Sequence, residues 1–216
     1  MKKYILLVFA LFLVGCSSSS SLPDFTASGY VADRGVVRIW RKDSQQQAAH
    51  IMTVYSPLNG DATEITDYTW QDGKLNAIER HIKGARPDDV TLRFDHQGNL
   101  SFMQRQLKGR REALSEDAVE LYRFDAQRML KISDALLSGH VMLLQGQWQA
   151  DGSVKTCQGK VLKPDLDSRE RGYVARRQAN ASMPVSIAWL DAPEDTQLLL
   201  VANEDYCAWE PKEADF

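Results

Sequence analysis

The sequence predicts an α+β fold that is rich in β-structure: an antiparallel meander sheet, curved or bent into a half-barrel, with one main amphipathic helix near 115–138. Three observations support this prediction. Short β-branched and aromatic runs recur along the chain, several of them form pairs around glycine-containing turns, and one stretch spaces its apolar residues with the period of a helix. We expect residues 25–216 to form a single globular domain.

Three β-hairpins form the centre of the predicted sheet. Each joins two strand-like runs through a polar turn that contains a glycine, and Asp72-Gly73 tolerates the positive φ that tight hairpins need. These hairpins are expected at 64–82, 90–107 and 141–161, with further strands at 36–40, 49–55, 185–190 and 197–202. The last strand should be central and buried, because its residues 198–201 are apolar on both faces.

The period of the apolar residues changes between the second and third hairpins. Ser115 suits the N-cap of a helix, and Glu116 and Asp117 place negative charge in its first turn. Apolar residues then follow at helical spacing as far as Gly139, which marks the end. We expect one amphipathic helix that packs on the sheet. The stretch 163–171 is strongly charged, and we expect it to be exposed.

Residues 1–15 have the parts of an export signal peptide. Lys2 and Lys3 supply a positive n-region, and the eleven-residue apolar run at 4–14 is shorter than the ~20 residues of a membrane-spanning helix. Residues 13–16 read L-V-G-C, which resembles the lipobox of bacterial lipoproteins. We expect cleavage before Cys16. The alternative is an ordinary signal peptide with a chance cysteine.

The resemblance to bacterial lipoproteins implies a membrane anchor at Cys16. In that class the cysteine carries three acyl chains, which hold a protein stably on a bilayer and make the membrane its partner. Ser17 stands where aspartate commonly signals inner-membrane retention, so the resemblance implies the outer membrane, with the domain facing the periplasm. Residues 16–24 then form a serine-rich tether whose ~8 flexible residues span only ~15 Å.

The composition is that of an ordinary globular protein. Removal of residues 1–15 leaves 201 residues, enough for one domain with a real core. The loss of Lys2 and Lys3 lowers the number of basic residues from 26 to 24 against 29 acidic residues, so the net charge moves from −3 to −5. An acidic balance of this kind gives no support to nucleic-acid binding.

The two remaining cysteines are expected to form a disulfide. Cys157 and Cys207 are an even pair in a chain addressed to an oxidising compartment. Closing a loop of 50 positions stabilises a fold by ~4 kcal/mol if the gain comes from chain entropy. The alternatives are a redox site or metal ligands, but the sequence has no C-x-x-C motif and no histidine beside either cysteine.

Catalytic, metal and cofactor motifs are not found. The four histidines form no local metal-binding pair, and nucleophile and phosphate-binding motifs are absent from the sequence. Glu79 and His81 should share a face of one strand, where a carboxylate could orient the imidazole, but a partly exposed cross-strand polar pair is the favoured interpretation. We therefore assign no catalytic residue, metal or cofactor.

Two basic clusters are candidate anion-binding sites in this acidic chain. They consist of Arg105, Lys108, Arg110 and Arg111, and of Arg169, Arg171, Arg176 and Arg177. If both met on one surface, they could bind the phosphates of lipid headgroups or lipopolysaccharide through the bidentate geometry of arginine. Glu112, Asp167 and Glu170 are interspersed, so the alternative is a solvated, partly self-paired surface.

A longer resemblance rests on residues 29–42, G-Y-V-A-D-R-G-V-V-R-I-W-R-K, together with the lipobox and the two late cysteines. In these features the chain resembles a group of enterobacterial lipoproteins of unknown function, the YjaH-like family. The resemblance covers most of the mature chain. It reinforces the membrane address, and it carries no activity, substrate or catalytic residue.

Three functional hypotheses follow. The first is a non-enzymatic outer-membrane lipoprotein whose sheet and helix bind a partner protein or another envelope component. The second is a carrier or chaperone for lipid or lipoprotein, which would need an unfilled apolar cavity of several hundred Å³ under the helix. The third is an enzyme acting on envelope glycans, which would need His81, Glu79 and an arginine in one cleft.

Overall fold

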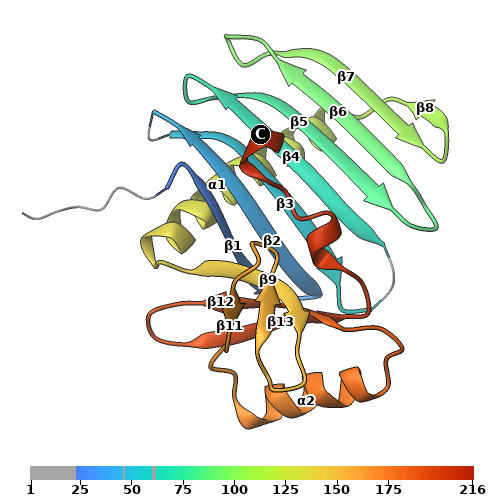
Figure 1. Cartoon of the computed structure of the whole chain (residues 1–216). Coiled ribbons are helices and arrows are strands. Elements are labelled where there is room, and N and C mark those ends of the chain that lie inside the picture. Colours follow the sequence, from blue (N-terminus) through green and yellow to red (C-terminus); the bar gives the residue numbers. More distant parts are fainter. Residues whose placement is uncertain (1–22, 46, 60–61) are drawn as a thin grey trace, which may run out of the picture.

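The computed structural model describes residues 23–45, 47–59 and 62–216 of the 216-residue chain. The predicted signal peptide, the lipidation site Cys16 and all of the tether except Pro23 and Asp24 lie outside the described residues. The described strands form two sheets, and a long helix packs against each of them (Figure 1).

Eight antiparallel strands form the larger sheet. Each strand pairs with its neighbours in the chain, in the order β1 to β8, so the sheet is a meander that does not close into a barrel. Its strands are β1 (Phe25–Ala32), β2 (Gly35–Ser44), β3 (Gln47–Pro57), β4 (Thr63–Gln71), β5 (Lys74–Lys83), β6 (Asp88–Phe94), β7 (Leu100–Leu107) and β8 (Arg110–Glu112). The predicted β-rich α+β class and antiparallel meander are confirmed.

The first two predicted hairpins are present in this sheet. Residues 64–82 correspond to β4 and β5, and Asp72 and Gly73 between them have φ values of 51° and 72°, as the turn requires. Residues 90–107 correspond to β6 and β7. The sequence pattern does not predict β1, which is rich in small residues, or β8, whose three residues are all exposed.

The third predicted hairpin belongs to a second sheet. Five strands pair in the order β11-β10-β9-β12-β13. They are β9 (Met142–Trp148), β10 (Val154–Thr156), β11 (Val161–Leu162), β12 (Ser186–Asp191) and β13 (Thr196–Ala202). The predicted single meander is therefore too simple, because β9 pairs with β12 across a gap in sequence that no local pattern marks.

The prediction that the last strand is central is wrong. β13 is an edge strand of the smaller sheet. Its side chains are nevertheless covered on both faces, because Leu198 and Val201 pack toward one core and Leu199 and Leu200 toward another. Apolar residues on both faces of a strand indicate that other elements pack on both faces of the sheet there. They do not indicate whether the strand has hydrogen-bonded neighbours at both edges.

Helix α1 (Glu116–Ser138) matches the predicted helix closely. The Ser115 side chain accepts a hydrogen bond from the Ala118 amide, and the amide of Gly139 bonds back to the last turn. Val119, Ala126 and Met129 are buried against the larger sheet. We call this covered side of the larger sheet its inner face, and the opposite side its outer face.

Helix α2 (Ser168–Ala179) begins within the charged stretch 163–171, whose charged side chains are largely exposed as expected, but the helix itself was not predicted. Asp167 and Glu170 form a reciprocal capping box that begins the helix. Leu166 and Val174 are buried against the smaller sheet. Only a narrow apolar stripe of α2 packs on the sheet. Because charged residues dominate this part of the sequence, the helical spacing of its apolar residues is not apparent.

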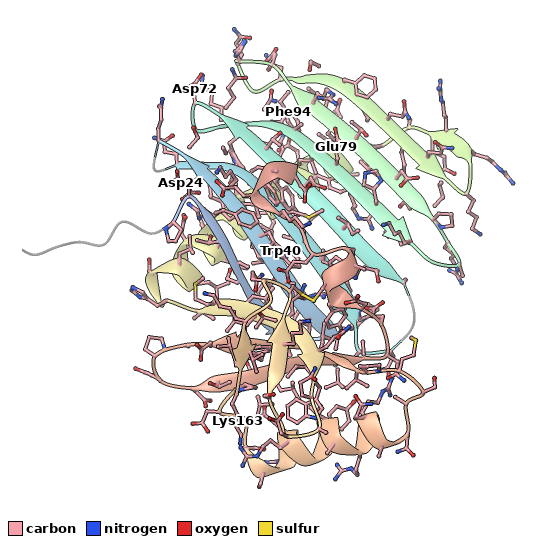
Figure 2. All side chains as sticks on the ribbon, in the orientation of Figure 1. Asp24, Trp40, Asp72, Glu79, Phe94 and Lys163 are labelled. Carbon is pink, nitrogen blue, oxygen red and sulfur yellow. A yellow bond between two sulfur atoms is a disulfide. The ribbon has the colours of Figure 1, made fainter. Side chains whose placement is uncertain are left out.

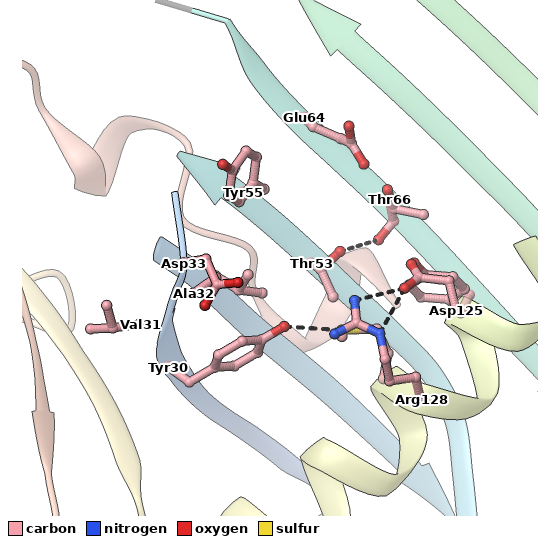
Figure 3. A pocket seen from close by; sticks show the side chains of 13 residues that line it. Tyr30, Val31, Ala32, Asp33, Thr53, Tyr55, Glu64, Thr66, Asp125 and Arg128 are labelled. Atoms are coloured by element: carbon pink, nitrogen blue, oxygen red, sulfur yellow. Dashed lines mark hydrogen bonds and ion pairs between the residues drawn. The ribbon is translucent and has the colours of Figure 1, made fainter. Parts of the chain in front are cut away.

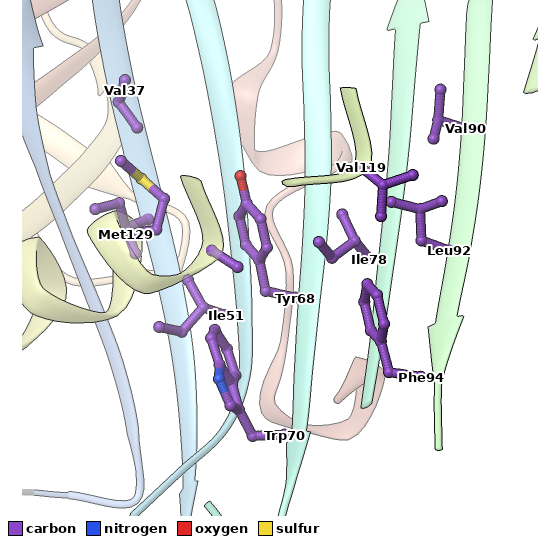
Figure 4. Close-up of a cluster of buried hydrophobic side chains, with 12 residues drawn as sticks. Val37, Ile51, Tyr68, Trp70, Ile78, Val90, Leu92, Phe94, Val119 and Met129 are labelled. Carbon is purple, nitrogen blue, oxygen red and sulfur yellow. The ribbon is translucent and has the colours of Figure 1, made fainter. Parts of the chain in front are cut away.

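Three buried clusters hold the layers together. The first lies between α1 and the inner face and includes Tyr68, Ile78 and Met129 (Figure 4). The second joins the outer face of β2 and β3 to the smaller sheet, and the third lies between the smaller sheet and α2. Strand β2 is consequently buried on both faces over most of its length.

The C-terminal segment crosses the outer face of the first strands. The disulfide between Cys157 and Cys207 is confirmed, with an S–S distance of 2.07 Å (Figure 2). Cys207 lies in the short 3-10 helix η1 (Tyr206–Ala208), ahead of η2 (Glu213–Asp215). Trp209 contacts Trp40, and the ring of Phe216 contacts Phe25. The disulfide therefore ties this segment to the smaller sheet.

Candidate functional site

The candidate site is a hollow on the inner face of the larger sheet, beside α1. Two adjoining hollows of about 520 Å³ and 450 Å³ share Glu64, Thr66, Tyr68 and Asp125, and together they form a groove bounded by the helix and the sheet. Figure 3 shows the first of them. We call this groove the inner groove. Its lining residues come mainly from β1–β7 on one side and from α1 on the other.

A hollow of about 640 Å³ lies elsewhere, between β3, α2 and β13. Its lining includes Leu58 and Ala62, and the structure does not describe residues 60–61 between them. Its described lining carries two charged side chains, Arg177 and Glu204, with no ion pair between them. The inner groove is the better candidate because its lining is a connected network of paired groups.

The alternation of the strands places polar side chains at one end of an otherwise apolar face. Glu64 and Thr66 share the inner face with Tyr68, two residues further along β4, since side chains at i and i+2 point the same way. Asp88 is in phase with Val90 in the same manner. The inner face is thus apolar under the helix and polar toward these strand ends.

Helix α1 forms the opposite wall through residues spaced three and four apart. Ala118, Tyr122, Asp125 and Met129 line the groove, together with Leu121 and Arg128 beside them. Leu121 is 67% exposed at the lip. A single side of α1 therefore faces the groove, while the neighbouring side packs into the core.

A chain of ion pairs crosses the floor of the groove. Arg105 donates to both carboxylate oxygens of Asp88, with Nε–Oδ1 at 2.9 Å and Nη2–Oδ2 at 3.0 Å. Arg80 donates to Asp88 at 3.3 Å and to Glu64 at 3.0 Å. The hydroxyl of Tyr122 accepts from Arg80 at 3.2 Å, which joins the floor to the helix.

A second group of polar contacts joins α1 to the first strands. The Tyr68 hydroxyl donates to Asp125 Oδ2 at 2.7 Å, and Arg128 donates to Asp125 Oδ1 at 2.7 Å. Arg128 also bonds the hydroxyl of Tyr30 (Figure 3). The polar groups of the groove are thereby held in fixed positions before any ligand binds.

The electrostatics of the groove follow from these partners. The hydrogen bonds from Arg105 hold the pKa of Asp88 below its ordinary value. Burial lowers the pKa of Arg80, but the hydrogen bond and charge of Glu64 more than offset this and raise it. Burial raises the pKa of Tyr68, and the nearby charge of Asp125 adds to the rise. Asp88 and Arg80 are thus charged at neutral pH, and Tyr68 is neutral.

The groove can therefore offer hydrogen bonds, aromatic surface and nearly balanced charge. Four carboxylates and three guanidinium groups line it: Asp33, Glu64, Asp88 and Asp125, and Arg80, Arg105 and Arg128. Within residues 23–45, 47–59 and 62–216, no group of three or more His, Cys, Asp or Glu side chains could hold a metal ion. In the same part of the chain, no helix is long and apolar enough to span a membrane.

Comparison with known proteins places the chain in a family. A family described as "Protein of unknown function (DUF1481)" matches residues 27–212. The chain belongs to this family. It is also 47% identical over 216 residues to the uncharacterized protein YjaH of Escherichia coli strain K12, a match that covers 100% of this chain and 93% of the relative. No solved structure matches the chain.

The matched region of the family includes both sheets, both long helices and the disulfide. Every residue that lines the inner groove lies within it. The expectation of a YjaH-like family is thereby confirmed.

The two predicted basic clusters do not meet. Arg105 lies in the inner groove on Asp88, whereas Arg110 and Arg111 are exposed on β8 at the edge of the larger sheet, and Lys108 lies in the turn before it. The other four arginines, Arg169, Arg171, Arg176 and Arg177, are on α2, beyond the smaller sheet (Figure 1). The proposed joint anion-binding surface is therefore not formed.

The predicted pair of Glu79 and His81 lies on the outer face of β5. Glu79 accepts from Arg93 at 3.0 Å, and the His81 imidazole is 2.7 Å from Asp89. Neither residue lines either hollow of the inner groove. The cleft that the glycan-enzyme hypothesis requires is not seen at these residues in the described chain.

The space beneath α1 is filled. Ile51, Tyr68, Ile78 and Leu92 are at most 2% exposed there and contact the buried side of the helix. The hollows lie beside the helix, and paired charges and tyrosines line much of them. No enclosed cavity is therefore seen directly beneath α1 in the described part of the chain, and the carrier hypothesis stays a prediction.

The sequence analysis did not identify the inner groove. Glu64, Arg80 and Asp88 do carry a signal, because each is a charged residue in phase with the apolar side of its strand. A charge at such a position must be paired or exposed at the strand end. No sequence pattern predicts that these three side chains lie close to one another and to α1.

Proposed function

We propose that the protein is an outer-membrane lipoprotein that faces the periplasm and binds an envelope component in the inner groove without catalysing a reaction. The observation that carries this proposal is the groove itself. It is a preformed hollow with fixed hydrogen-bonding groups at one end of a packed sheet.

The address in this proposal depends on the N-terminal sequence. Lys2 and Lys3, the eleven-residue apolar run and the L-V-G-C box match a lipoprotein signal in order and in length. Ser17 favours transfer to the outer membrane. The disulfide between Cys157 and Cys207 agrees with an oxidising compartment.

The binding role depends on the organisation of the groove. Burying charged side chains costs desolvation free energy, which their ion pairs offset only in part. Apolar side chains on the inner face would stabilise the fold without this cost. Here, seven side chains from four strands and α1 form hydrogen bonds or ion pairs around an open space. A ligand that replaces the water in this space would meet groups that are already oriented, which lowers the entropic cost of binding.

Crosslinking in living cells tests this role. A photoreactive amino acid is placed at Leu121, at the lip of the groove, and at the control position Val161 on β11, which is similarly exposed at 66%. We expect a discrete adduct from position 121 and none above background from position 161. Equal labelling from both positions, or no adduct from position 121, would contradict a binding role for the groove.

A further inference from the structure

We infer that the inner groove binds a neutral, polyhydroxylated sugar chain. The inference rests on the proposed function, in which the groove is the binding site, and it adds the chemical class of the ligand. Four features of the groove support it: its shape, the groups on its floor, the balance of its charges and its tyrosines.

The shape of the groove suits an extended ligand. Its two hollows adjoin through shared residues, and the lining runs from Tyr30 on β1 across the sheet to Arg105 on β7. Neighbouring strands are ~4.8 Å apart, so a groove that crosses them from β1 to β7 is longer than a single sugar ring. A chain of several linked rings would fill it.

The floor offers side chains and no main-chain groups. It is the face of a sheet, where the backbone N–H and C=O groups already pair between strands. An extended peptide usually gains affinity by pairing its backbone with a free strand edge. The floor over β3–β6 provides no such edge, and the groove meets an edge strand only at its β1 end. A sugar chain, in contrast, is recognised through side-chain hydrogen bonds to its hydroxyl groups.

The charges of the groove favour a neutral ligand. Arg80, Arg105 and Arg128 each bond a carboxylate, so an anion would have to displace a partner that is already in place. A hydrocarbon chain would strip water from these ion pairs without replacing its hydrogen bonds. A polyhydroxylated chain can donate to the carboxylates and accept from the guanidinium groups at the same time.

The tyrosines supply the complementary apolar surface. Tyr30, Tyr55 and Tyr122 line the groove and are half-buried, while Tyr68 is buried and contributes its hydroxyl. A tyrosine combines a flat apolar ring with a polar tip. One face of a sugar ring carries mainly C–H groups and its rim carries hydroxyls, so the two surfaces match.

The position of the groove indicates where such a chain would be met. The tether enters β1 at Phe25, whereas the groove is lined by Tyr30 to Asp33 at the other end of that strand and the turn after it. At ~3.3 Å per residue, these ends are ~25 Å apart. The groove therefore lies away from the point of attachment. Peptidoglycan strands and lipopolysaccharide oligosaccharides are the two envelope sources of this chemistry. The inference concerns their uncharged sugar units and not the carboxylate or phosphate groups that both polymers also carry.

The test uses the full-length lipidated protein in a detergent without a sugar headgroup. The probe is fluorescently labelled chitotetraose, a neutral chain of N-acetylglucosamine, and binding is followed by fluorescence polarisation. Leu121→Arg places a charge in the groove, and Phe124→Arg is the matched control, because Phe124 is 62% exposed on the same helix and lines neither hollow. Hexametaphosphate and palmitate serve as competitors of other chemical classes.

Saturable binding that Leu121→Arg weakens by about tenfold or more, and Phe124→Arg by less than about twofold, supports the inference. Displacement by peptidoglycan glycan strands or by lipopolysaccharide oligosaccharide identifies the source, and failure of both to compete overturns the inference. No saturable binding up to about 10 mM, equal loss in both variants, or displacement by hexametaphosphate or palmitate also overturns it. If the adduct from position 121 persists in any of those cases, the groove remains a binding site for another ligand class.

Discussion

The Asp88 carboxylate lies between two guanidinium groups, and its contact with Arg105 uses both oxygens, at 2.9 Å and 3.0 Å. The side chain of Asp88 is only 9% exposed. A single carboxylate thus pairs with two arginines on the floor of the inner groove. This relationship makes Asp88 the residue on which the order of the groove depends most.

Replacing Asp88 by asparagine should destabilise the fold. Asp88→Asn keeps the size of the side chain but leaves Arg80 and Arg105 close together without their shared counter-charge, at a cost of about 2 kcal/mol. The free energy of unfolding in urea measures this cost. Asp89→Asn is the control, because its side chain is 49% exposed and pairs only with His81, and it should change stability by less than about 0.5 kcal/mol. Similar values for the two variants would show that the ion pairs contribute little.

The contribution of Asp88 should also depend on pH. Its pKa is lowered in the folded protein from an ordinary value of 3.8, chiefly by the hydrogen bonds from Arg105. A carboxyl with a lower pKa in the folded state stabilises the protein above its unfolded pKa and loses that contribution as the pH falls through the folded value. The stability difference between the wild-type protein and Asp88→Asn should therefore be full at neutral pH and shrink below 3.8. Unfolding in urea at pH 6 and at pH ~2.5 measures it, and a constant difference would contradict this assignment.

The disulfide should contribute substantially to stability. Reduction of the bond between Cys157 and Cys207 frees a loop of 50 positions and the C-terminal segment that lies across Trp40, so we expect a loss of about 2–4 kcal/mol. Thermal unfolding with and without dithiothreitol measures this loss. The double variant Cys157→Ser/Cys207→Ser should unfold at the same temperature with or without the reductant. A wild-type protein that is insensitive to reduction would show that the segment is held by its other contacts.

Arg38 should make two opposite contributions to the free energy of unfolding. Its buried charge should destabilise the fold, and the packing of its side chain should stabilise it. It is 1% exposed, lies over the rings of Tyr206 and Trp209 at 4.7 Å and 4.5 Å, and forms no ion pair with a described residue. Burial lowers its pKa. Arg38→Met keeps most of the packing and removes the buried charge, so we expect it to be more stable than Arg38→Ala by about 2 kcal/mol in urea unfolding.

The comparison of these two variants separates packing from charge. Equal loss in both variants would mean that the guanidinium group itself, through Gln145, Ser56 and the two rings, supplies the stabilisation. An Arg38→Met variant as stable as the wild-type protein would show that packing alone is sufficient.

Local patterns predicted the local parts of the fold. The capping signal at Ser115 and the glycine after Ser138 fix both ends of α1, and Asp72-Gly73 fixes the turn between β4 and β5, because these features depend on residues a few positions apart. Helix α2 was missed since its buried stripe is narrow, with Val174 as its only described buried residue. The pairing of β9 with β12 was missed because it joins segments separated by α2 and two short strands.

The inner groove could be predicted only in part. Asp88 on the apolar side of β6 indicates a charge that needs a partner, and so does Arg80 on β5. Their meeting with Glu64 and Tyr122 depends on the register of three strands and on the direction of α1 across them. These are non-local quantities that propensity and periodicity do not encode.

The proposed periplasmic localisation and the proposed orientation of the inner groove both depend on an acyl anchor at Cys16. The most direct test is the labelling of growing cells with radioactive palmitate, followed by membrane fractionation of the wild-type precursor and of Cys16→Ala. We expect the wild-type protein to carry label and to sediment with the outer membrane, and Cys16→Ala to lose both properties. Label and outer-membrane retention in Cys16→Ala would contradict the account.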